Sequence, residues 1–192
     1  MQPYCICYRI ELQCYRIERL NGCILACQKL VDRGIPICGF YTTEVRGQNG
    51  QRTGFKVVDV NSKEEAVLST TTPQLGGRNR PKVGRYSVLV DEFERIALNA
   101  LAGASNAKII IIDEIGKMEL FSQNFVQTVE KLFAEPAAQL LATIPIAKGR
   151  PIPLIEKIRN LPDSVVVHVS TENRDGLVDQ ILKMFDVFES RE

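Results

Sequence analysis

One stretch constrains the fold more than any other, the sequence AKIIIIDEIGKMEL at residues 107–120. Its run of four isoleucines is short and β-branched, which is typical of a strand buried on both faces of a parallel sheet. Such a strand delivers the next residues, Asp113 and Glu114, to the carboxyl edge of the sheet, where open α/β folds bind ligands. Two acids there are costly to desolvate unless a cation, a donor or water compensates them. The pattern predicts a Walker B strand, whose first acid organises Mg²⁺ and whose second polarises an attacking water.

The size and charge of the chain narrow its class. A length of 192 residues suits one domain, or one domain with a small excursion. Lys and Arg total 24 and Asp and Glu total 23, so the net charge of +1 gives no electrostatic reason to expect nucleic acid or membrane as a partner. No apolar run approaches the roughly 20 residues of a spanning helix, and the N-terminus lacks the order of a signal peptide. We expect a soluble, cytoplasmic monomer.

All six cysteines lie within the first 38 residues. A disulfide framework belongs to small secreted domains, and this chain has too much apolar periodicity for that class. Zinc is the sharper alternative, but no CxxC pair is present and the single histidine, His168, is remote in sequence. We therefore favour free thiols, with a cysteine-based metal module at the N-terminus as the alternative.

From residue 84 onward, strand and helix patterns alternate. Strands are expected at 84–90, 107–112, 139–144 and 164–169, and helices at 91–102, 123–133, 153–161 and 171–188. Asp91, followed by Glu94, has the spacing of a capping box, and Ser122 is placed to cap the next helix. The alternation predicts a mostly parallel sheet covered on both faces, a three-layer α/β/α fold.

The first third of the chain is less regular. Residues 4–10 suggest a strand and 15–33 a helix, which Gly34 and Pro36 end in the usual order. The Asn49-Gly50 turn between apolar runs predicts a β-hairpin, which makes 35–60 an excursion from the sheet. Residues 61–83 are polar, and we expect a long loop there with at most one short strand.

Several longer motifs carry a resemblance to a known family. They are GFYTTEVR at 39–46, VGRYSV at 83–88, DEIGKMELFS at 113–122, TIPIAKGRP at 143–151, EKIRN at 156–160 and TENRDGL at 171–177. In this order they closely resemble the cancer-related nucleoside-triphosphatase family, which is similar to small archaeal and bacterial nucleotide triphosphatases. The resemblance covers residues 23–188. It implies a P-loop fold, Mg²⁺ dependence, and hydrolysis of nucleoside triphosphates such as ATP and GTP to diphosphates with loose base preference.

The resemblance also suggests roles for single residues. Asp113 is the metal ligand, Glu114 the general base, and Lys117 a phosphate contact or a partner of Glu114. The nucleotide-binding candidates are Thr143, Lys148, Arg150, Asn173 and Arg174, with Arg85 less strongly indicated. Each has a plainer alternative, because strand-end threonines, capping residues and solvated loop cations are common.

The beginning of the chain departs from the family pattern. Family members begin with a strand that runs into GxxGxGKTT, and by register this loop should lie just before Cys23. The sequence there is CYRIERLNG, and no GK[ST] occurs anywhere in the chain. A phosphate loop needs glycines to turn its N–H groups inward, a lysine for the β- and γ-oxygens and a hydroxyl for Mg²⁺. Arg16 and Arg19 supply charge but not this cradle.

We therefore divide the chain into residues 1–22, an atypical segment in place of the phosphate loop, and residues 23–192, a single P-loop-type domain. Two origins of the first segment stay open: a natural form without the loop, or an alternative or wrongly assigned first exon. Two functions also stay open. The chain is either an active nucleoside-triphosphate phosphohydrolase, or a catalytically silent relative that binds nucleotide weakly or binds only partners.

Overall fold

The computed structural model describes residues 9–14, 22–76, 79–135, 138–145, 150–169 and 174–186. Its strands are β1 (Arg9–Cys14), β2 (Ile37–Arg46), β3 (Arg52–Asp59), β4 (Glu65–Thr70), β5 (Lys82–Val83), β6 (Tyr86–Val88), β7 (Ile109–Ile112), β8 (Leu140–Pro145) and β9 (Ser164–Val169). Its α-helices are α1 (Gly22–Asp32), α2 (Pro73–Gly76), α3 (Val90–Ala102), α4 (Gln123–Ala134), α5 (Pro153–Arg159) and α6 (Arg174–Asp186). Two 3₁₀ turns, η1 (Ala104–Asn106) and η2 (Glu119–Phe121), flank β7.

These strands form one mixed sheet in the order β5-β6-β4-β3-β2-β7-β8-β1-β9. The neighbours from β2 to β9 are parallel, and those from β2 to β5 are antiparallel. The isoleucine strand β7 lies between β2 and β8, and all four of its residues are buried. The buried, β-branched run therefore occupies the interior of the parallel half, as its composition predicts.

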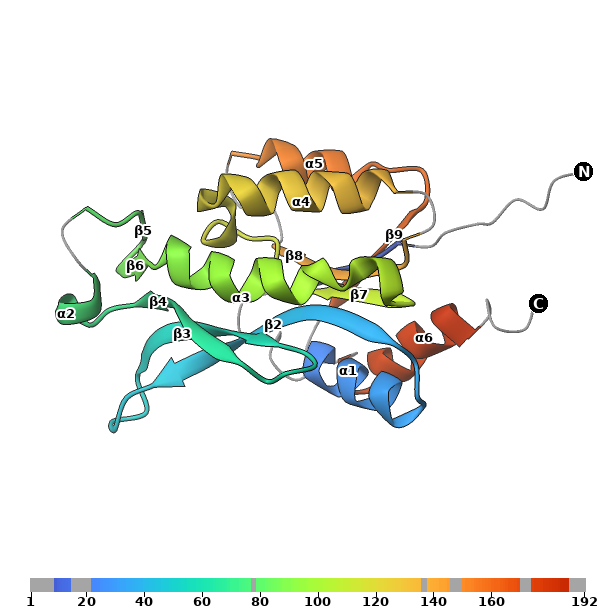
Figure 1. Cartoon of the computed structure of the whole chain (residues 1–192), viewed down its shortest axis with the longest axis horizontal. Coiled ribbons are helices and arrows are strands. Elements are labelled where there is room, and N and C mark those ends of the chain that lie inside the picture. The colour runs from blue at the N-terminus through green and yellow to red at the C-terminus, as the bar shows by residue number, and fades with distance from the viewer. Residues whose placement is uncertain are drawn as a thin grey trace, which may run out of the picture.

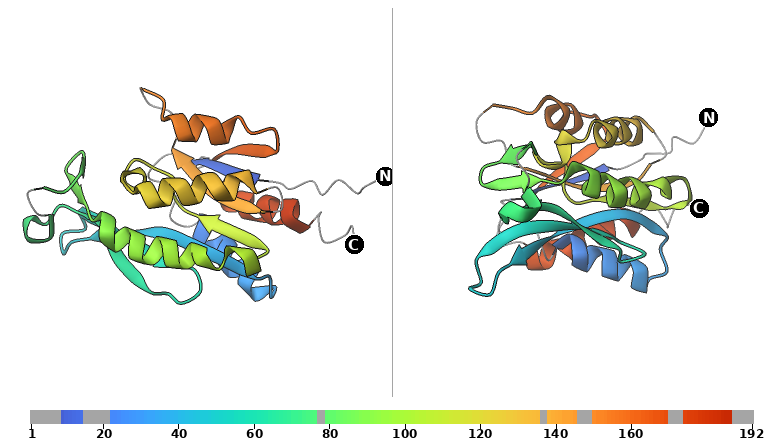
Figure 2. Two further views of the ribbon diagram at one scale, coloured as in Figure 1. Left: turned by 45° about the horizontal axis from the view of Figure 1, so that its top comes forward. Right: turned by 60° about the vertical axis from the view of Figure 1, so that its left-hand side comes forward.

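Helices cover both faces of the sheet, so the fold has three layers (Figure 1). One core lies between the sheet and α3, α4 and α5, and it includes the mutually edge-on rings of Phe40, Phe93 and Phe125. The other core lies on the opposite face, against α1 and α6. Figure 2 shows the same arrangement from two further sides. The expected α/β/α P-loop-type class is confirmed, and so is the β-hairpin, whose strands β2 and β3 belong to the same sheet.

Three local expectations were wrong. Residues 61–83 hold β4, α2 and β5 rather than a long loop with one short strand, because pairing with the distant strands β3 and β6 makes these segments strands. Asp91 is not the cap of α3, whose N-cap is Leu89 without a side-chain hydrogen bond. The early strand is Arg9–Cys14 and lies between β8 and β9. Residues 4–8 and 15–21, part of the expected strand and helix, lie outside the described residues.

Gly39 shows how closely β2 approaches the isoleucine strand. Its φ is +111°, and a Cβ built there would lie 1.9 Å from the carbonyl oxygen of Ile111. We expect Gly39→Ala to lower the free energy of unfolding by about 3 kcal/mol, because backbone strain and a backbone clash add together. The measurement is urea denaturation.

Gly50→Ala is the matched control. Its φ is +73°, but nothing lies within 4 Å of its Cβ position. It should cost only the strain of a left-handed residue, about 1 kcal/mol. Equal losses in the two variants would contradict the close approach of β2 and β7.

No helix among the described residues is both long enough and apolar enough to cross a membrane.

Candidate functional site

The candidate site lies at the carboxyl end of β7, between the neighbouring strands β2 and β8. The amide of Asp113, directly after β7, donates to the carbonyl of Phe40 on β2 at 3.1 Å. The amide of Ile115 donates to the carbonyl of Thr143 on β8 at 2.9 Å. The first turn after the isoleucine strand is therefore held to both neighbouring strands.

Asp113 and Thr143 meet through their side chains. The Thr143 hydroxyl donates to Oδ1 of Asp113 at 2.5 Å, and each residue is only 1% exposed. A buried carboxylate needs such donors, because its desolvation is costly. The structure thus joins two of the predicted site residues, which lie 30 positions apart in sequence.

The carboxylates of Glu114 and Glu119 both lie next to Gly116. The amide of Gly116 donates to Oε2 of Glu119 at 3.1 Å, and Glu119 is 3% exposed. A Cβ added to Gly116 would lie 2.2 Å from Oε1 of Glu114 and 2.8 Å from Oε2 of Glu119. The carboxylates of Glu114 and Glu119 therefore both lie close to the Cβ position of Gly116. A residue with a side chain at position 116 would displace them. Glu114 is half-buried, unlike Asp113 and Glu119, which are buried.

The loop after Glu114 is anchored by a contact that the sequence did not predict. The Ser122 hydroxyl donates to Oε1 of Glu94 on α3 at 2.5 Å and accepts from the Phe125 amide at 2.9 Å, so Ser122 caps α4 as expected. The Asn124 side chain donates to the other oxygen of Glu94 at 3.1 Å. Glu94 thus accepts hydrogen bonds from Ser122 and Asn124 at the start of α4 and does not form a capping box on α3.

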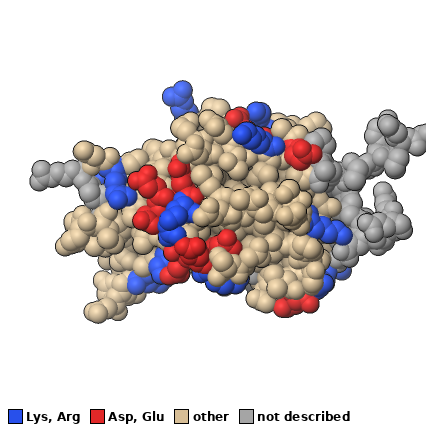
Figure 3. Space-filling view, viewed as in Figure 1, with Lys and Arg blue, Asp and Glu red and all other residues tan. Residues whose placement is uncertain are grey.

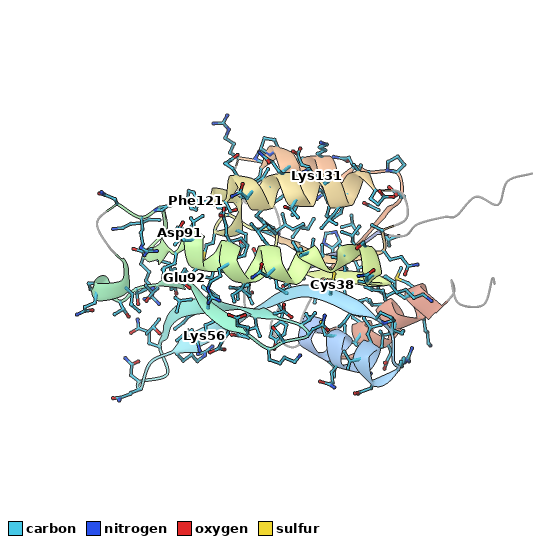
Figure 4. All side chains as sticks on the ribbon, viewed as in Figure 1. Cys38, Lys56, Asp91, Glu92, Phe121 and Lys131 are labelled. Carbon is cyan, nitrogen blue, oxygen red and sulfur yellow. The ribbon has the colours of Figure 1, made fainter. Side chains whose placement is uncertain are left out.

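The labelled side chains in Figure 4 locate this end of the molecule. Phe121, from the turn before α4, lies at the end of α3 that carries Asp91 and Glu92, whereas Cys38 lies toward the other end of α3 (Figure 4). Phe121 is 41% exposed although it is a large aromatic residue. Phe121 therefore presents an exposed aromatic ring beside the start of α3, whereas Asp113 and Thr143 are buried.

Helix α1 approaches the same edge from the opposite face of the sheet. Burial, with a further contribution from the Asp113 carboxylate, raises the pKa of the Cys27 thiol to about 12. Burial also raises the pKa of the Cys38 thiol to about 11. Both are free, buried cysteines, as expected of inert thiols. Cys5 and Cys7, and the side chains of Cys14 and Cys23, lie outside the described part.

For the other predicted site residues the structure gives only their exposure or their position in the fold. Lys117 and Arg150 are exposed, and Arg174 is the first residue of α6. Lys148 and Asn173 lie outside the described residues, as does the side chain of Arg174. The structure therefore brings Asp113, Glu114 and Thr143 together and does not test the remaining nucleotide contacts.

The donor set suits Mg²⁺. This ion prefers hard oxygen ligands and usually takes one or two protein carboxylates, with water and substrate phosphates completing its shell. Asp113, held by Thr143, supplies such a carboxylate. Among the described side chains, no cluster of three or more His, Cys, Asp or Glu residues forms a complete metal cage. Asp113 thus fits a shared metal and nucleotide site.

The acid pair follows β7 at the carboxyl end of the parallel half of the sheet, and β8 lies between β7 and β1. A family model described as NTPase matches residues 23–182. The chain therefore belongs to the nucleoside-triphosphatase family.

Two solved structures share this fold. THEP1 from Aquifex aeolicus superposes with a TM-score of 0.77 at 33% identity, covering 92% of this chain and 98% of that one. A human cancer-related nucleoside triphosphatase gives a TM-score of 0.77 at 36% identity, covering 97% and 100%. In sequence, the mouse cancer-related nucleoside-triphosphatase homolog is 40% identical over 162 residues, covering 82% of this chain and 85% of the relative.

Proposed function

We propose that this protein is a Mg²⁺-dependent nucleoside-triphosphate phosphohydrolase, which converts a triphosphate such as ATP or GTP and water into a diphosphate and phosphate. One observation carries the proposal: a buried aspartate held by Thr143, with the half-buried Glu114 beside it, at the carboxyl end of β7. Family membership supports the same reaction.

Each residue has a distinct task in this proposal. Bound Mg²⁺ would neutralise charge that develops on the transferred phosphoryl group. Asp113 offers the carboxylate for the metal, and the Thr143 hydroxyl fixes the orientation of that carboxylate. Glu114, the half-buried acid next to Asp113, orients the attacking water and accepts its proton. Lys117, Lys148, Arg150, Asn173 and Arg174 are the proposed contacts to phosphate and base.

Removing the metal should abolish the reaction. With excess Mg²⁺ we expect phosphate release from both ATP and GTP, and with a chelator in excess of Mg²⁺ we expect release at the level of buffer alone, because the metal would neutralise charge that develops on the transferred phosphoryl group. The measurement is a colorimetric phosphate assay. Hydrolysis that continues unchanged without divalent cations would contradict the proposal.

A second candidate is a catalytically silent relative that binds nucleotide weakly or not at all. Two observations favour it: the chain contains no GK[ST], and the family match begins only at residue 23. Residues 15–21, between β1 and α1, carry YRIERLN instead of a glycine-rich loop. On this proposal residues 1–22 are the atypical segment and residues 23–192 the nucleotide-binding-type domain.

Thermal denaturation separates the two candidates. A ligand present at 100 times its dissociation constant stabilises the folded state by about 2.7 kcal/mol. The silent candidate predicts no shift in melting temperature at millimolar Mg·ATP, whereas the phosphohydrolase predicts an increase. A clear increase without phosphate release would support weak binding without catalysis.

A further inference from the structure

A cluster of charged residues lies on the hairpin, outside the acidic edge. The arginine–tyrosine cluster, as we define it, consists of Glu44, Arg46, Arg52, Arg85 and Tyr86. Phe40 on β2 pairs with the last residue of β7, and β2 then continues past the edge of the sheet as far as Arg46. Glu44 is four residues beyond Phe40, so its backbone lies about 13 Å along β2 from Phe40, whose carbonyl accepts from the Asp113 amide.

A single carboxylate serves two of the three arginines. Arg52 donates to one oxygen of Glu44 at 2.6 Å, and Arg46 donates to the other at 2.5 Å. The Glu44 side chain is only 8% exposed. Both carboxylate oxygens of Glu44, the one acid in the cluster, thus accept a hydrogen bond from an arginine. Arg52 is held further by the Phe55 ring, whose centroid lies 5.2 Å from its guanidinium carbon.

Arg85 is held in place without an acid. Its Nη2 donates to the backbone carbonyl of Arg52 at 2.8 Å and to the Tyr86 hydroxyl at 3.3 Å. Its guanidinium carbon lies 5.3 Å from the centroid of the Tyr86 ring, and the residue is exposed. No ion pair joins Arg85 to a carboxylate within the part of the chain that the structure describes. Its remaining N–H groups are therefore oriented and available to a ligand.

The pKa of Tyr86 is lowered by the positive charge of the neighbouring arginines. Burial raises the pKa of its hydroxyl, but hydrogen bonds from Arg85 and Arg52 outweigh burial, so the pKa lies below its ordinary value. Figure 3 shows acidic and basic side chains side by side on the face it displays, and two ion pairs of β3, β4 and α3 are Arg95 with Glu64 and Lys56 with Glu65. The arginine–tyrosine cluster instead has three guanidinium groups for one carboxylate.

We propose that the arginine–tyrosine cluster binds a phosphate group of a small molecule, with Arg85 and Arg52 as the donors. A planar guanidinium presents paired N–H groups that match phosphate oxygens, and a preorganised donor loses less entropy on binding. Because the Glu44 backbone lies about 13 Å along β2 from Phe40, which accepts from the Asp113 amide, the site is too distant for one phosphate to share a metal bound at Asp113. The inference goes beyond the proposed hydrolysis and does not rest on it.

The test is a titration with inorganic phosphate, followed at backbone amides by heteronuclear NMR in Mg²⁺-free buffer. We expect saturable shifts at Arg52, Arg85 and Tyr86. Shifts confined to residues 113–119, or no saturable shifts, would overturn the proposal. Because no turnover is needed, a chain that hydrolyses nothing can still pass this test, so the two proposals fail separately.

Two variants sharpen the assignment. Arg85→Gln, at an exposed position, should weaken phosphate binding about tenfold or more, since a charge-assisted hydrogen bond is lost. Arg85→Lys keeps the charge but loses the fork, and should bind with intermediate affinity. The matched control is Arg95→Gln, which makes the same change at an exposed arginine already paired with Glu64 and Glu92. Equal weakening in Arg85→Gln and Arg95→Gln would mean a general charge effect and would overturn the site.

The choice of anion is tested in the same way. Acetate at equal ionic strength should not produce the saturable shifts, and adenosine monophosphate should produce them at the same amides as inorganic phosphate. Acetate binding as tight as phosphate would overturn the assignment to phosphate. Unaltered melting temperatures of the variants, measured without ligand, would show that they are folded.

Discussion

Glu114→Gln is expected to reduce phosphate release from Mg·ATP by about 10²–10⁴-fold, the usual contribution of a well-placed general base. The substitution keeps the size of the side chain and removes its negative charge and with it the ability to accept a proton from water. The backbone on both sides of Glu114 is held, because the Asp113 amide donates to Phe40 on β2 and the Ile115 amide donates to Thr143 on β8. The measurement is the steady-state rate of phosphate release at saturating nucleotide.

Glu130→Gln is the control for this prediction. Glu130 is exposed on α4 and pairs with Lys157 at 3.1 Å, a surface ion pair worth under about 1 kcal/mol. The same chemical change at this position should leave the rate unchanged. If the unaltered chain, Glu114→Gln and Glu130→Gln all released phosphate at one rate, Glu114 would have no catalytic role.

Restoring a phosphate loop should have the opposite effect, a rise in rate on the order of 10²-fold or more. β1 ends at Cys14 and α1 begins at Gly22, which is the strand-to-helix connection where a glycine-rich loop cradles phosphates. The combined variant Arg16→Gly, Asn21→Gly, Gly22→Lys and Cys23→Ser creates the motif spacing at this connection. It provides the lysine and hydroxyl that the present sequence lacks.

A partial version of this variant is the control. Arg16→Gly with Asn21→Gly adds the two glycines without the lysine and hydroxyl, and should raise the rate much less. Nucleotide binding is measured alongside by the shift in melting temperature. A restored loop that binds Mg·ATP tightly but hydrolyses it no faster than the unaltered chain would contradict the proposed role of the acidic edge.

The sequence predicted the parallel half of the sheet and its acids, because short apolar runs and their flanking residues are local signals. Ile109 to Ile112 form the buried strand, and Asp113 meets Thr143 at its end. A loop with one short strand was expected at 61–83, and the extent of regular structure there was missed, because the pairing of β4 with β3 and β6 depends on distant segments. Strand propensity is weak evidence where such pairing decides the outcome.

The same distinction applies to the site. The part played by Glu94 could not be predicted, since its spacing from Asp91 favoured a capping box and only the fold brings it to Ser122 and Asn124. The arginine–tyrosine cluster joins Glu44, Arg52 and Arg85 from two separate motifs, GFYTTEVR and VGRYSV, and the strand between them. Each residue was visible in the sequence, but their contact depends on the pairing of β2, β3, β4 and β6.

The central claim is that Asp113 and Glu114 form the metal-and-water half of a triphosphate site that a phosphate loop completes. The most direct test is phosphate release from Mg·ATP by the loop-restored chain, measured with and without Glu114→Gln. We predict that restoration raises the rate and that Glu114→Gln removes the gain. A gain that survives Glu114→Gln in full would contradict the claim.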